Sequence, residues 1–508
     1  MPQAAPPSRS RSNPLRYCLL ALLTVALLGA MIGTRSWPLV GDAGLMHYVV
    51  FLLKAGAVPY RQVIDINLPG TYFFEQTGIA LFGAGPHGLR LYDSFLLGSV
   101  LLASLGLAGR RHWFAACFSG LLFALVHLQD GLEQQGQRDL LLAVLLLSGL
   151  GAFRLLLESA GHRPLAAFLF GLAFGASFTI KPVFLPLTIA LLLLGFAKGP
   201  LRSALSLALA TTGLLAPGTL ALCWLSRKGA LRSFFAIAHS LMPLHATLGR
   251  RSLPFLLAHS FSPLGLLLVV CLLLPVLSRK SLLDHKLILA AGLAGALLAY
   301  LLQGKGYPYQ RYPFLVILLV AMGTTLNTAL DEPGPVRSLA LVTLCCAGGL
   351  GLFFAWRSTT YDIETPTETA LSRQLAAFGS PSQLTGTVQC LDTFGGCLTS
   401  LYDLGIRQST GFLYDCYLFN GAGPERDSYR SQFWAAFHQA KPRLVVLSSQ
   451  NCFKDYNGGY GRITSWPALA DELHAHYREV TTWSPTRPVA WFSRKRMPFG
   501  FKLLLRDR

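Results

Sequence analysis

Two carboxylates follow the first apolar stretch of the sequence: Asp42 in a Gly-Asp-Ala-Gly run, and Asp65 shortly before a Pro-Gly turn. A carboxylate at such a position can take a proton from the hydroxyl group of a substrate or bind a cation. Asp42 also precedes a helical pattern, where an aspartate can cap free backbone amides. From the residues alone, the cap is the better-supported interpretation of Asp42. The alternative is catalysis by Asp42, with Asp65 orienting the loop.

A basic and aromatic stretch could bind phosphate. It holds Lys305 between two glycines, followed by Tyr307, Tyr309 and Arg311. A cation between glycines can approach a phosphate closely, with exposed backbone amides beside it. Lys181, at the end of another apolar stretch, could serve the same phosphate. The competing interpretation is a basic hinge whose tyrosines anchor the chain at the membrane interface. We favour phosphate binding by Lys305 and Arg311 and regard Lys181 as the weaker candidate.

A membrane-embedded scaffold must position these residues. The 508-residue chain is 52% hydrophobic and 13% charged, and its mean hydropathy is +0.47. Soluble proteins are about 25% charged, so a soluble enzyme, a disordered chain and a coiled coil are all poor fits. Long apolar runs are typical of a polytopic α-helical membrane protein. Lysine and arginine in cytoplasmic loops explain the net charge of +19, and no basic face suited to nucleic acid is visible.

Hydropathy and charge predict about eleven transmembrane helices, with an uncertainty of about two. The candidate spans are 17–32, 91–109, 112–128, 139–157, 164–180, 183–197, 203–224, 262–278, 286–302, 312–330 and 336–356. The charge bias places the N-terminus in the cytoplasm, and an odd number of spans then places the C-terminus outside. We therefore expect a cytoplasmic tail (1–16), a transmembrane domain (17–357) with a first external loop at 35–90, and an extracytoplasmic domain (358–508). The amphipathic, basic segment 225–260 is expected to lie along the membrane surface.

The C-terminal region has the composition of a soluble α/β domain, with a buried strand at 441–448 and an amphipathic helix at 466–477. It contains Cys390, Cys397, Cys416 and Cys452. Four cysteines in an extracytoplasmic domain suggest disulfides, and three connectivities are open. We expect at least one disulfide: Cys390–Cys397 would close a short glycine-containing loop and leave Cys416–Cys452 as the other pair. The spacing lacks the paired CxxC pattern of a zinc site, so no metal is indicated.

Several motifs occur in an order that resembles a known enzyme class. They are Asp42 soon after the first span, a Pro-Tyr-Arg step at 59–61, an Asp-x-x-x-Pro-Gly run at 65–70, a Gln-Arg-Asp run around Arg138, and the stretch 303–313. This order resembles the C-type (GT-C) membrane glycosyltransferases, closest to bacterial relatives of the protein O-mannosyltransferase and aminoarabinose-transferase families. The resemblance covers residues 15–330 well and the C-terminal domain loosely.

Three positions depart from the pattern of that class. Ala43 stands where many members have Glu. Leu140 stands where many have His. Gln310 also stands at a usual His position, so a role that needs imidazole there is excluded for this chain.

The resemblance implies a bacterial inner-membrane enzyme that transfers a sugar from a polyprenyl-phosphate donor to an envelope glycan, lipid or protein on the periplasmic side. It implies a direct, inverting displacement in which Asp42 activates the acceptor hydroxyl. Arg138, Lys181, Lys305, Tyr309 and Arg311 are then the expected ligands of the donor phosphate. No particular cofactor is implied, and a divalent metal is possible but not indicated. A lipid-linked-sugar transporter or flippase is the alternative, although it predicts ionisable residues within spans and usually an internal repeat. A third possibility is a non-catalytic envelope protein whose C-terminal domain binds partners.

Overall fold

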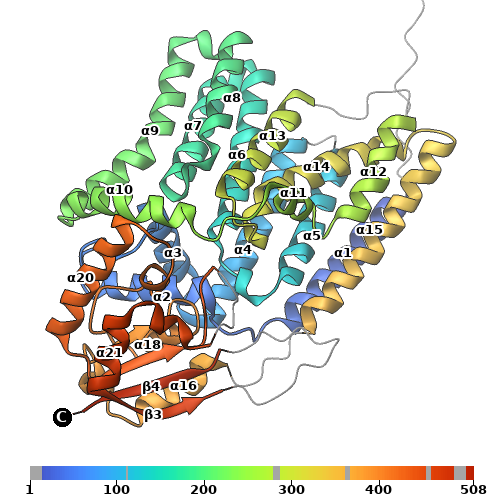
Figure 1. Cartoon of the computed structure of the whole chain (residues 1–508). Helices are drawn as coiled ribbons and strands as arrows, with labels where there is room; N and C mark the ends of the chain where they lie inside the picture. The colour runs from blue at the N-terminus through green and yellow to red at the C-terminus, as the bar shows by residue number, and fades with distance from the viewer. Residues whose placement is uncertain are drawn as a thin grey trace, which may run out of the picture.

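The computed structural model describes residues 14–109, 112–277, 286–360, 366–453, 459–484 and 499–507. Its helical bundle is formed by the first two thirds of the chain, and a smaller α/β domain packs against one end of it (Figure 1). The predicted architecture, a polytopic helical protein with a C-terminal α/β domain, is confirmed.

Eight described helices are long and apolar enough to cross a membrane, or nine spans if one bent pair counts as a span. The eight are α1 (Pro14–Gly33), α4 (Gly85–Ala108), α5 (Trp113–Asp130), α6 (Arg138–Glu158), α7 (Arg163–Ile180), α9 (Ala204–Arg227), α14 (Tyr312–Ala329) and α15 (Pro335–Thr359). The bent pair is α11 (Leu253–Ser260) with α12 (Gly265–Leu277), at an angle of 72°. Two shorter apolar helices, α8 (Leu185–Ala197) and α13 (Lys286–Gln303), occupy the remaining predicted segments. The predicted count of eleven spans is therefore not confirmed.

The contacts of α1 show which segments lie at each end of the bundle. Arg16, near the start of α1, forms an ion pair with Asp331 in the loop between α14 and α15, at 2.7 Å. At the other end of the same helix, Gly33 packs against Thr359, the last residue of α15. The chain enters the C-terminal domain just beyond Thr359. The start of α1 and the C-terminal domain thus lie at opposite ends of the bundle, as the predicted topology requires.

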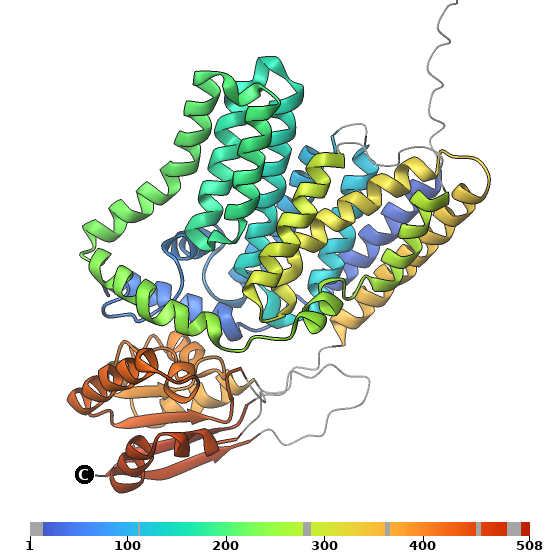
Figure 2. The ribbon, with the colours of Figure 1, turned by 45° about the horizontal axis from the view of Figure 1, so that its top comes forward.

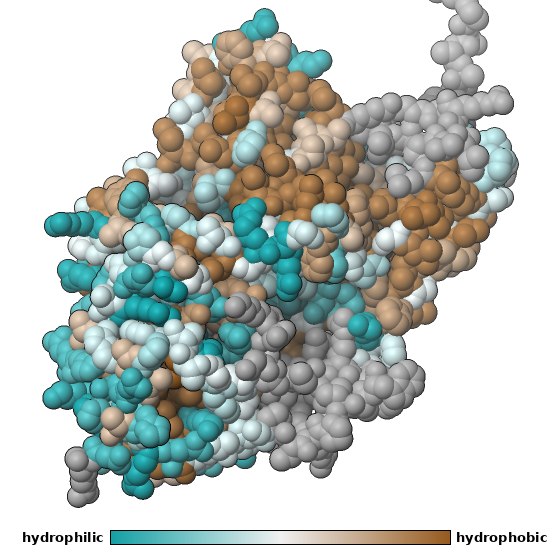
Figure 3. Space-filling model, viewed as in Figure 1, coloured by the Kyte–Doolittle hydropathy of each residue, from teal (hydrophilic) through white to brown (hydrophobic). Residues whose placement is uncertain are grey.

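The surface of the bundle is apolar in a way that a water-soluble protein would not tolerate. Large side chains such as Val25, Leu102 and Leu220 are each more than 65% exposed. Figure 3 shows this apolar surface over the bundle, and hydrophilic surface over much of the C-terminal domain. Exposed apolar area of this extent is expected of a surface that faces lipid.

Short helices lie between the bundle and the C-terminal domain (Figure 2). They are α2 (Gly41–Lys54) and α3 (Pro69–Phe82), from the loop between α1 and α4, and α10 (Leu231–Thr247). Leu241 and Leu244 of α10 are buried, whereas its basic residues are more exposed. Most of the segment 225–260 is therefore helical, in α10 and in α11 (Leu253–Ser260), and α10 lies at this end of the bundle. Its position along the membrane surface stays a prediction.

The C-terminal domain is built on a four-stranded sheet of order β1-β2-β4-β3. Its strands are β1 (Val388–Leu391), β2 (Leu444–Ser448), β3 (Tyr477–Trp483) and β4 (Phe501–Arg506). Its helices are α16 (Thr367–Ala376), α17 (Pro381–Leu384), α18 (Cys397–Asp403), α19 (Cys416–Phe419), α20 (Pro424–Ala440) and α21 (Pro467–His476). The predicted strand at 441–448 and the predicted helix at 466–477 correspond to β2 and α21.

β1 and β2 are parallel, with Val388 opposite Leu444, and every residue of both strands is buried. Buried parallel strands are apolar on both faces, which explains the continuous hydrophobic run that predicted β2. Because the two strands are parallel, their carboxyl ends meet at one edge of the sheet.

The C-terminal domain and α2 share one hydrophobic core. Leu45, Val49 and Leu52 of α2 pack in the same buried cluster as Leu398 and Leu401 of α18. Beside this core, the backbone N–H of Gln408 donates to the Tyr48 hydroxyl at 2.8 Å, and that of Ile64 donates to the carbonyl of Gly411 at 2.8 Å. The first external loop therefore fixes the domain against the end of the bundle that carries the predicted site residues.

Candidate active site

A cavity of about 1060 Å³ lies between the bundle and the C-terminal domain. Five of the seven predicted site residues line it: Asp42, Arg138, Lys181, Lys305 and Tyr309. They come from the start of α2, the start of α6, the end of α7 and the loop before α14. The fold thus brings together one carboxylate, three cations and a tyrosine from segments up to 267 residues apart.

Asp42 is not a helix cap. The N-cap of α2 is Val40, which makes no side-chain capping bond, and Asp42 lies one residue inside the helix. Its Oδ2 accepts hydrogen bonds from Arg138 Nη2 and Gln137 Nε2, both at 3.2 Å. The side chain is 18% exposed, so the carboxylate is oriented by its partners and still accessible from the cavity. This geometry fits a reacting group better than a cap.

A second, much smaller cavity of about 20 Å³ lies on another side of Asp42. It shares Asp42, Gln137 and Arg138 with the large cavity and adds Thr71 and Glu75 of α3. A space of this size holds about one water molecule or hydroxyl group. Nothing in the sequence motifs singled out Glu75, yet its carboxylate lies close to the predicted base.

Lys305 reaches the cavity from a tight turn. Gly304 and Gly306 have φ values of +69° and +71°, a conformation that glycine adopts without strain. The amine of Lys305 donates to Nε2 of His245 at 2.5 Å, and the ring of Phe453 lies 4.9 Å away. The Gly-Lys-Gly spacing is therefore required to place this cation.

Burial, together with the nearby Lys181, lowers the pKa of Lys305 to about 7, and Asp42 opposes this shift. Burial and Lys305 hold the pKa of His245 well below its usual value, so the imidazole is neutral. Neutral His245 can accept from Lys305 through Nε2 while its Nδ1–H donates to the Tyr417 hydroxyl at 2.7 Å. A helix of the interface and the C-terminal domain thus both help to position Lys305.

Two polar side chains hold the amine of Lys181 at the cavity. Its amine donates to Oδ2 of Asp139 at 2.5 Å and to Oε1 of Gln303 at 3.1 Å, and it lies 5.6 Å from the Tyr309 ring. Burial lowers its pKa, and the adjacent Asp139 opposes this shift. The sequence ranked Lys181 below Arg311 as a phosphate ligand, but of the two only Lys181 lines the cavity.

Arg311 does not line the cavity. Its Nη2 donates to both carboxylate oxygens of Asp130 at 2.9 Å, and Nη1 donates to the carbonyl of His259 at 3.2 Å. Both partners of the ion pair are at least 93% buried. The phosphate-binding role predicted for Arg311 therefore needs correction: its guanidinium is held by a buried carboxylate and supports the turn that carries Tyr309.

Asp65 also lies outside the cavity. Its carboxylate accepts from the hydroxyls of Tyr72 (2.9 Å) and Tyr414 (2.6 Å) and from the side-chain amide of Asn67 (2.8 Å). Asp65 is fully buried and does not line the cavity, and its bond to Tyr414 joins the segment between α1 and α4 to the C-terminal domain. The orienting role expected of Asp65 stays a prediction, and this placement favours it over a catalytic role.

The sequence did not identify a buried cluster behind the site. Oδ1 of Asp93 accepts the backbone N–H of Gly136 at 2.9 Å, and Oδ2 contacts His127 at 3.0 Å and Arg90 at 3.1 Å. This cluster fixes the turn that presents Gln137 and Arg138 to Asp42. The sequence does place Asp93 and His127 within predicted apolar spans. An ionisable residue inside a span is energetically unfavourable, so such residues are candidates for a function by default.

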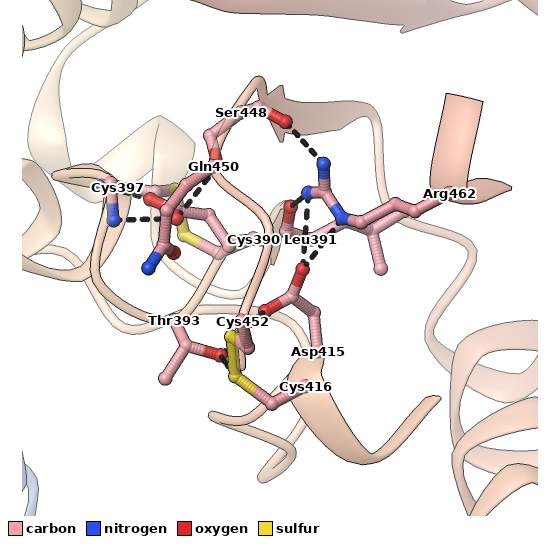
Figure 4. Close-up of polar contacts among 12 residues, drawn as sticks. Cys390, Leu391, Thr393, Cys397, Asp415, Cys416, Ser448, Gln450, Cys452 and Arg462 are labelled. Atoms are coloured by element: carbon pink, nitrogen blue, oxygen red, sulfur yellow. Dashed lines mark hydrogen bonds and ion pairs between the residues drawn. A yellow bond between two sulfur atoms is a disulfide. The ribbon is translucent and has the colours of Figure 1, made fainter. Parts of the chain in front are cut away.

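The structure joins Cys390 to Cys397 and Cys416 to Cys452 (Figure 4). Cys416 and Cys452 lie beside Asp415, a grouping that could otherwise hold a metal. A disulfide leaves no thiolate to act as a ligand. We expect denatured, unreduced protein to show none of these four cysteines among its free thiols on maleimide labelling. Labelling of all four would contradict the crosslinks and reopen the metal interpretation.

No protein-family model and no curated protein matches the sequence. Solved structures do match. The aminoarabinose transferase ArnT from Cupriavidus metallidurans bound to undecaprenyl phosphate aligns with a TM-score of 0.58 at 13% identity, over 96% of this chain and 98% of that one. Its apo form gives 0.59 at 14% identity, over 97% and 98%. The Archaeoglobus fulgidus oligosaccharyltransferase tethered to an acceptor peptide aligns with a TM-score of 0.54 at 14% identity, over 93% of this chain and 74% of that one. ArnT and this oligosaccharyltransferase are both members of the GT-C superfamily.

The chain has the GT-C fold. The fold family expected from the motifs is thereby confirmed, including the part of the chain beyond residue 330 where the sequence resemblance was loose. Because the identities are low, the likeness establishes the GT-C fold and leaves the reaction to be argued from the site.

Proposed function

We propose that the chain is a membrane glycosyltransferase that moves a sugar from a polyprenyl-phosphate donor to a hydroxyl-bearing acceptor of the cell envelope. The observation that carries the proposal is the convergence of Arg138, Lys181 and Lys305 on a cavity that also exposes Asp42. Cations gathered at the ends of apolar helices suit an anionic group attached to a lipid. The undecaprenyl phosphate bound to the structurally similar ArnT is a ligand of this class.

The chemistry is a single displacement. Asp42 takes the proton of the acceptor hydroxyl, and the hydroxyl oxygen forms a bond to the anomeric carbon of the sugar. The bond between that carbon and the phosphate oxygen breaks, and the electron pair leaves with polyprenyl phosphate. Lysine and arginine side chains stabilise the negative charge that develops on the leaving phosphate. Attack from the side opposite the phosphate inverts the anomeric configuration.

The proposal includes a location: the plasma membrane of a bacterium, with the cavity and residues 366–507 on the outer side. Protease added to intact spheroplasts should cleave within the C-terminal domain, and epitopes added ahead of α1 should resist it until the cells are opened. The prediction rests on the charge bias of the loops. Protection of the C-terminal domain in intact spheroplasts would reverse the orientation and place Asp42 in the cytoplasm.

Phosphate binding should depend on pH through Lys305. With a pKa of about 7 in the free protein, Lys305 is increasingly neutral above that pH, whereas a bound phosphate favours its charged form. Binding must then take up a proton, so affinity should fall about tenfold for each pH unit above 7 until the pKa of the complex is reached. The measurement is titration of the purified protein with undecaprenyl phosphate between pH 6 and 9.

Lys305→Arg is the matched control, because arginine stays charged over this range. It should remove the share of the pH dependence that comes from Lys305, and the remaining slope reports the other titrating groups, including the ligand's own phosphate. Lys305→Ala should bind more weakly at pH 6 and show the same residual slope. Identical pH profiles for wild type and Lys305→Arg would exclude Lys305 as a phosphate ligand.

A further inference from the structure

The C-terminal domain contributes one wall of the cavity. Phe394 follows the end of β1, and Phe453 lies five residues beyond the end of β2. In α/β sheets, ligands bind outside the carboxyl ends of parallel strands. That edge of the sheet faces the cluster of cations, so the domain is placed to contact whatever the cations bind.

The two phenylalanines differ from the other three aromatic residues of this wall. Phe499 is buried. Tyr414 and Tyr417 are at least 96% buried, and their hydroxyls are bonded to Asp65 and His245. Phe394 and Phe453 are only half-buried and present ring surface to the cavity. They are therefore available to a ligand.

Hydrogen bonds and an ion pair hold the carboxyl ends of β1 and β2 in place (Figure 4). Arg462 donates to the carbonyl of Leu391 at 2.9 Å, to the carbonyl of Ser448 at 2.6 Å and to the Asp415 carboxylate at 3.1 Å. The backbone N–H of Phe394 donates to Oε1 of Gln450 at 3.1 Å, which ties the two loops together. This network gives the wall a fixed shape.

The backbone of Phe453 is strained. Its φ of +67° is rare for a bulky residue, and such conformations persist only where the surroundings impose them, often at ligand clamps. The preceding Cys452 is held by its disulfide to Cys416, and Gly249 leaves the space that the Phe453 ring occupies. The fold therefore directs this ring to a set position, 4.9 Å from the amine of Lys305.

We propose that Phe394 and Phe453 form the subsite for the sugar ring of the donor. The inference rests on the proposed function. The anomeric carbon is bonded to a phosphate oxygen, so a phosphate held by Lys305 places the sugar ring within a few ångströms of Phe453. The C–H face of a pyranose or furanose ring is apolar and can pack on an aromatic face, whereas its hydroxyls can reach polar cavity residues such as Gln134 and Gln310.

The test compares lipid probes with and without a sugar. Purified full-length protein is titrated with undecaprenyl phosphate and with a panel of its glucosyl, mannosyl, galactosyl and arabinosyl esters. Wild type should bind at least one ester more tightly than the bare phosphate. Phe453→Leu and Phe394→Leu should each lower the preference for that ester over the bare phosphate by about three- to tenfold, the range expected for loss of one aromatic contact. The ratio of the two affinities is the readout because the Phe453 ring also lies against Lys305, so its loss can change binding of the bare phosphate as well. Phe378→Leu, a partly buried residue of the same domain outside the cavity, is the matched control and should change neither.

The outcomes separate this inference from the function on which it rests. If wild type binds the bare phosphate but the two variants keep the full preference for the ester, the rings are only packing partners of Lys305 and the subsite is refuted. A wild type that prefers no ester of the panel would also refute it. If wild type binds none of the lipids, the proposed function fails first. A shift of the unfolding temperature in both variants, with equal loss for ester and bare phosphate, would assign the rings to folding instead.

Discussion

Asp42→Asn should lower the rate of sugar transfer by roughly two to four orders of magnitude, the usual contribution of a general base. Asparagine has nearly the same size, and its oxygen can still accept from Gln137 and Arg138, so the fold and the entrance of the cavity should be kept. Its amide cannot accept a proton at neutral pH. The measurement is the initial rate of sugar transfer from the lipid fraction to the envelope acceptor in membranes that contain equal amounts of protein.

The control for Asp42 is Asp65→Asn. Asp65 is buried beneath two tyrosine hydroxyls and does not touch the cavity, so its replacement should lower the unfolding temperature and leave the turnover of folded protein nearly unchanged. Asp42→Asn should instead leave the unfolding temperature nearly unchanged and lower the turnover of folded protein. Near-normal transfer by Asp42→Asn would remove the residue on which the mechanism depends.

Arg311→Ala should destabilise the protein by about 3–5 kcal/mol, because it leaves the buried Asp130 carboxylate without its partner. This expectation differs from the one drawn from the sequence, in which Arg311 binds phosphate. Thermal unfolding in detergent measures the change. Arg61→Ala, an exposed arginine of the first external loop, is the matched control and should shift stability by no more than about 0.5 kcal/mol.

The buried ion pair between Arg311 and Asp130 leads to a second prediction. Replacing both partners with apolar residues, Arg311→Met with Asp130→Leu, should recover much of the lost stability, because an apolar pair can replace a buried ion pair at little cost. Arg311→Ala protein that unfolds like wild type but no longer binds undecaprenyl phosphate would contradict the buried-pair account and return Arg311 to the phosphate site.

Composition and periodicity were sufficient for the architecture. Apolar runs determined the spans because a helix in lipid must satisfy its backbone internally, and the apolar run within 441–448 identified a buried strand. The number of spans was harder to obtain. α8 and α13 are apolar but short, and the break between α11 and α12 bends one segment by 72°, which hydropathy does not detect.

The site was predictable where a local motif sets the geometry. The two glycines beside Lys305 require a turn, and that turn does place the amine in the cavity. The same stretch could not distinguish Lys305 from Arg311, because the partner of Arg311 is Asp130, 181 residues earlier in the chain. The choice between cap and base at Asp42 was likewise undecidable locally, since Gln137 and Arg138 reach it from another helix.

The contributions of the C-terminal domain could not be read from the sequence at all. Phe453 meets Lys305, and Tyr417 meets His245 of α10, only because the domain docks on α2 and α10 through a shared apolar core. No spacing rule connects residues so far apart. A single sequence contains no signal for such contacts, whereas the folded chain displays them directly.

Transfer of a sugar from a polyprenyl-phosphate carrier to an envelope acceptor should be visible in the envelope itself. The measurement is mass spectrometry of envelope glycans, lipids and proteins from cells that have the chain, lack it, or carry only Asp42→Asn. One sugar residue should disappear from one envelope acceptor when the chain is lost, and wild type should restore it whereas Asp42→Asn should not. An unchanged set of envelope sugars in cells without the chain would refute the proposed transfer.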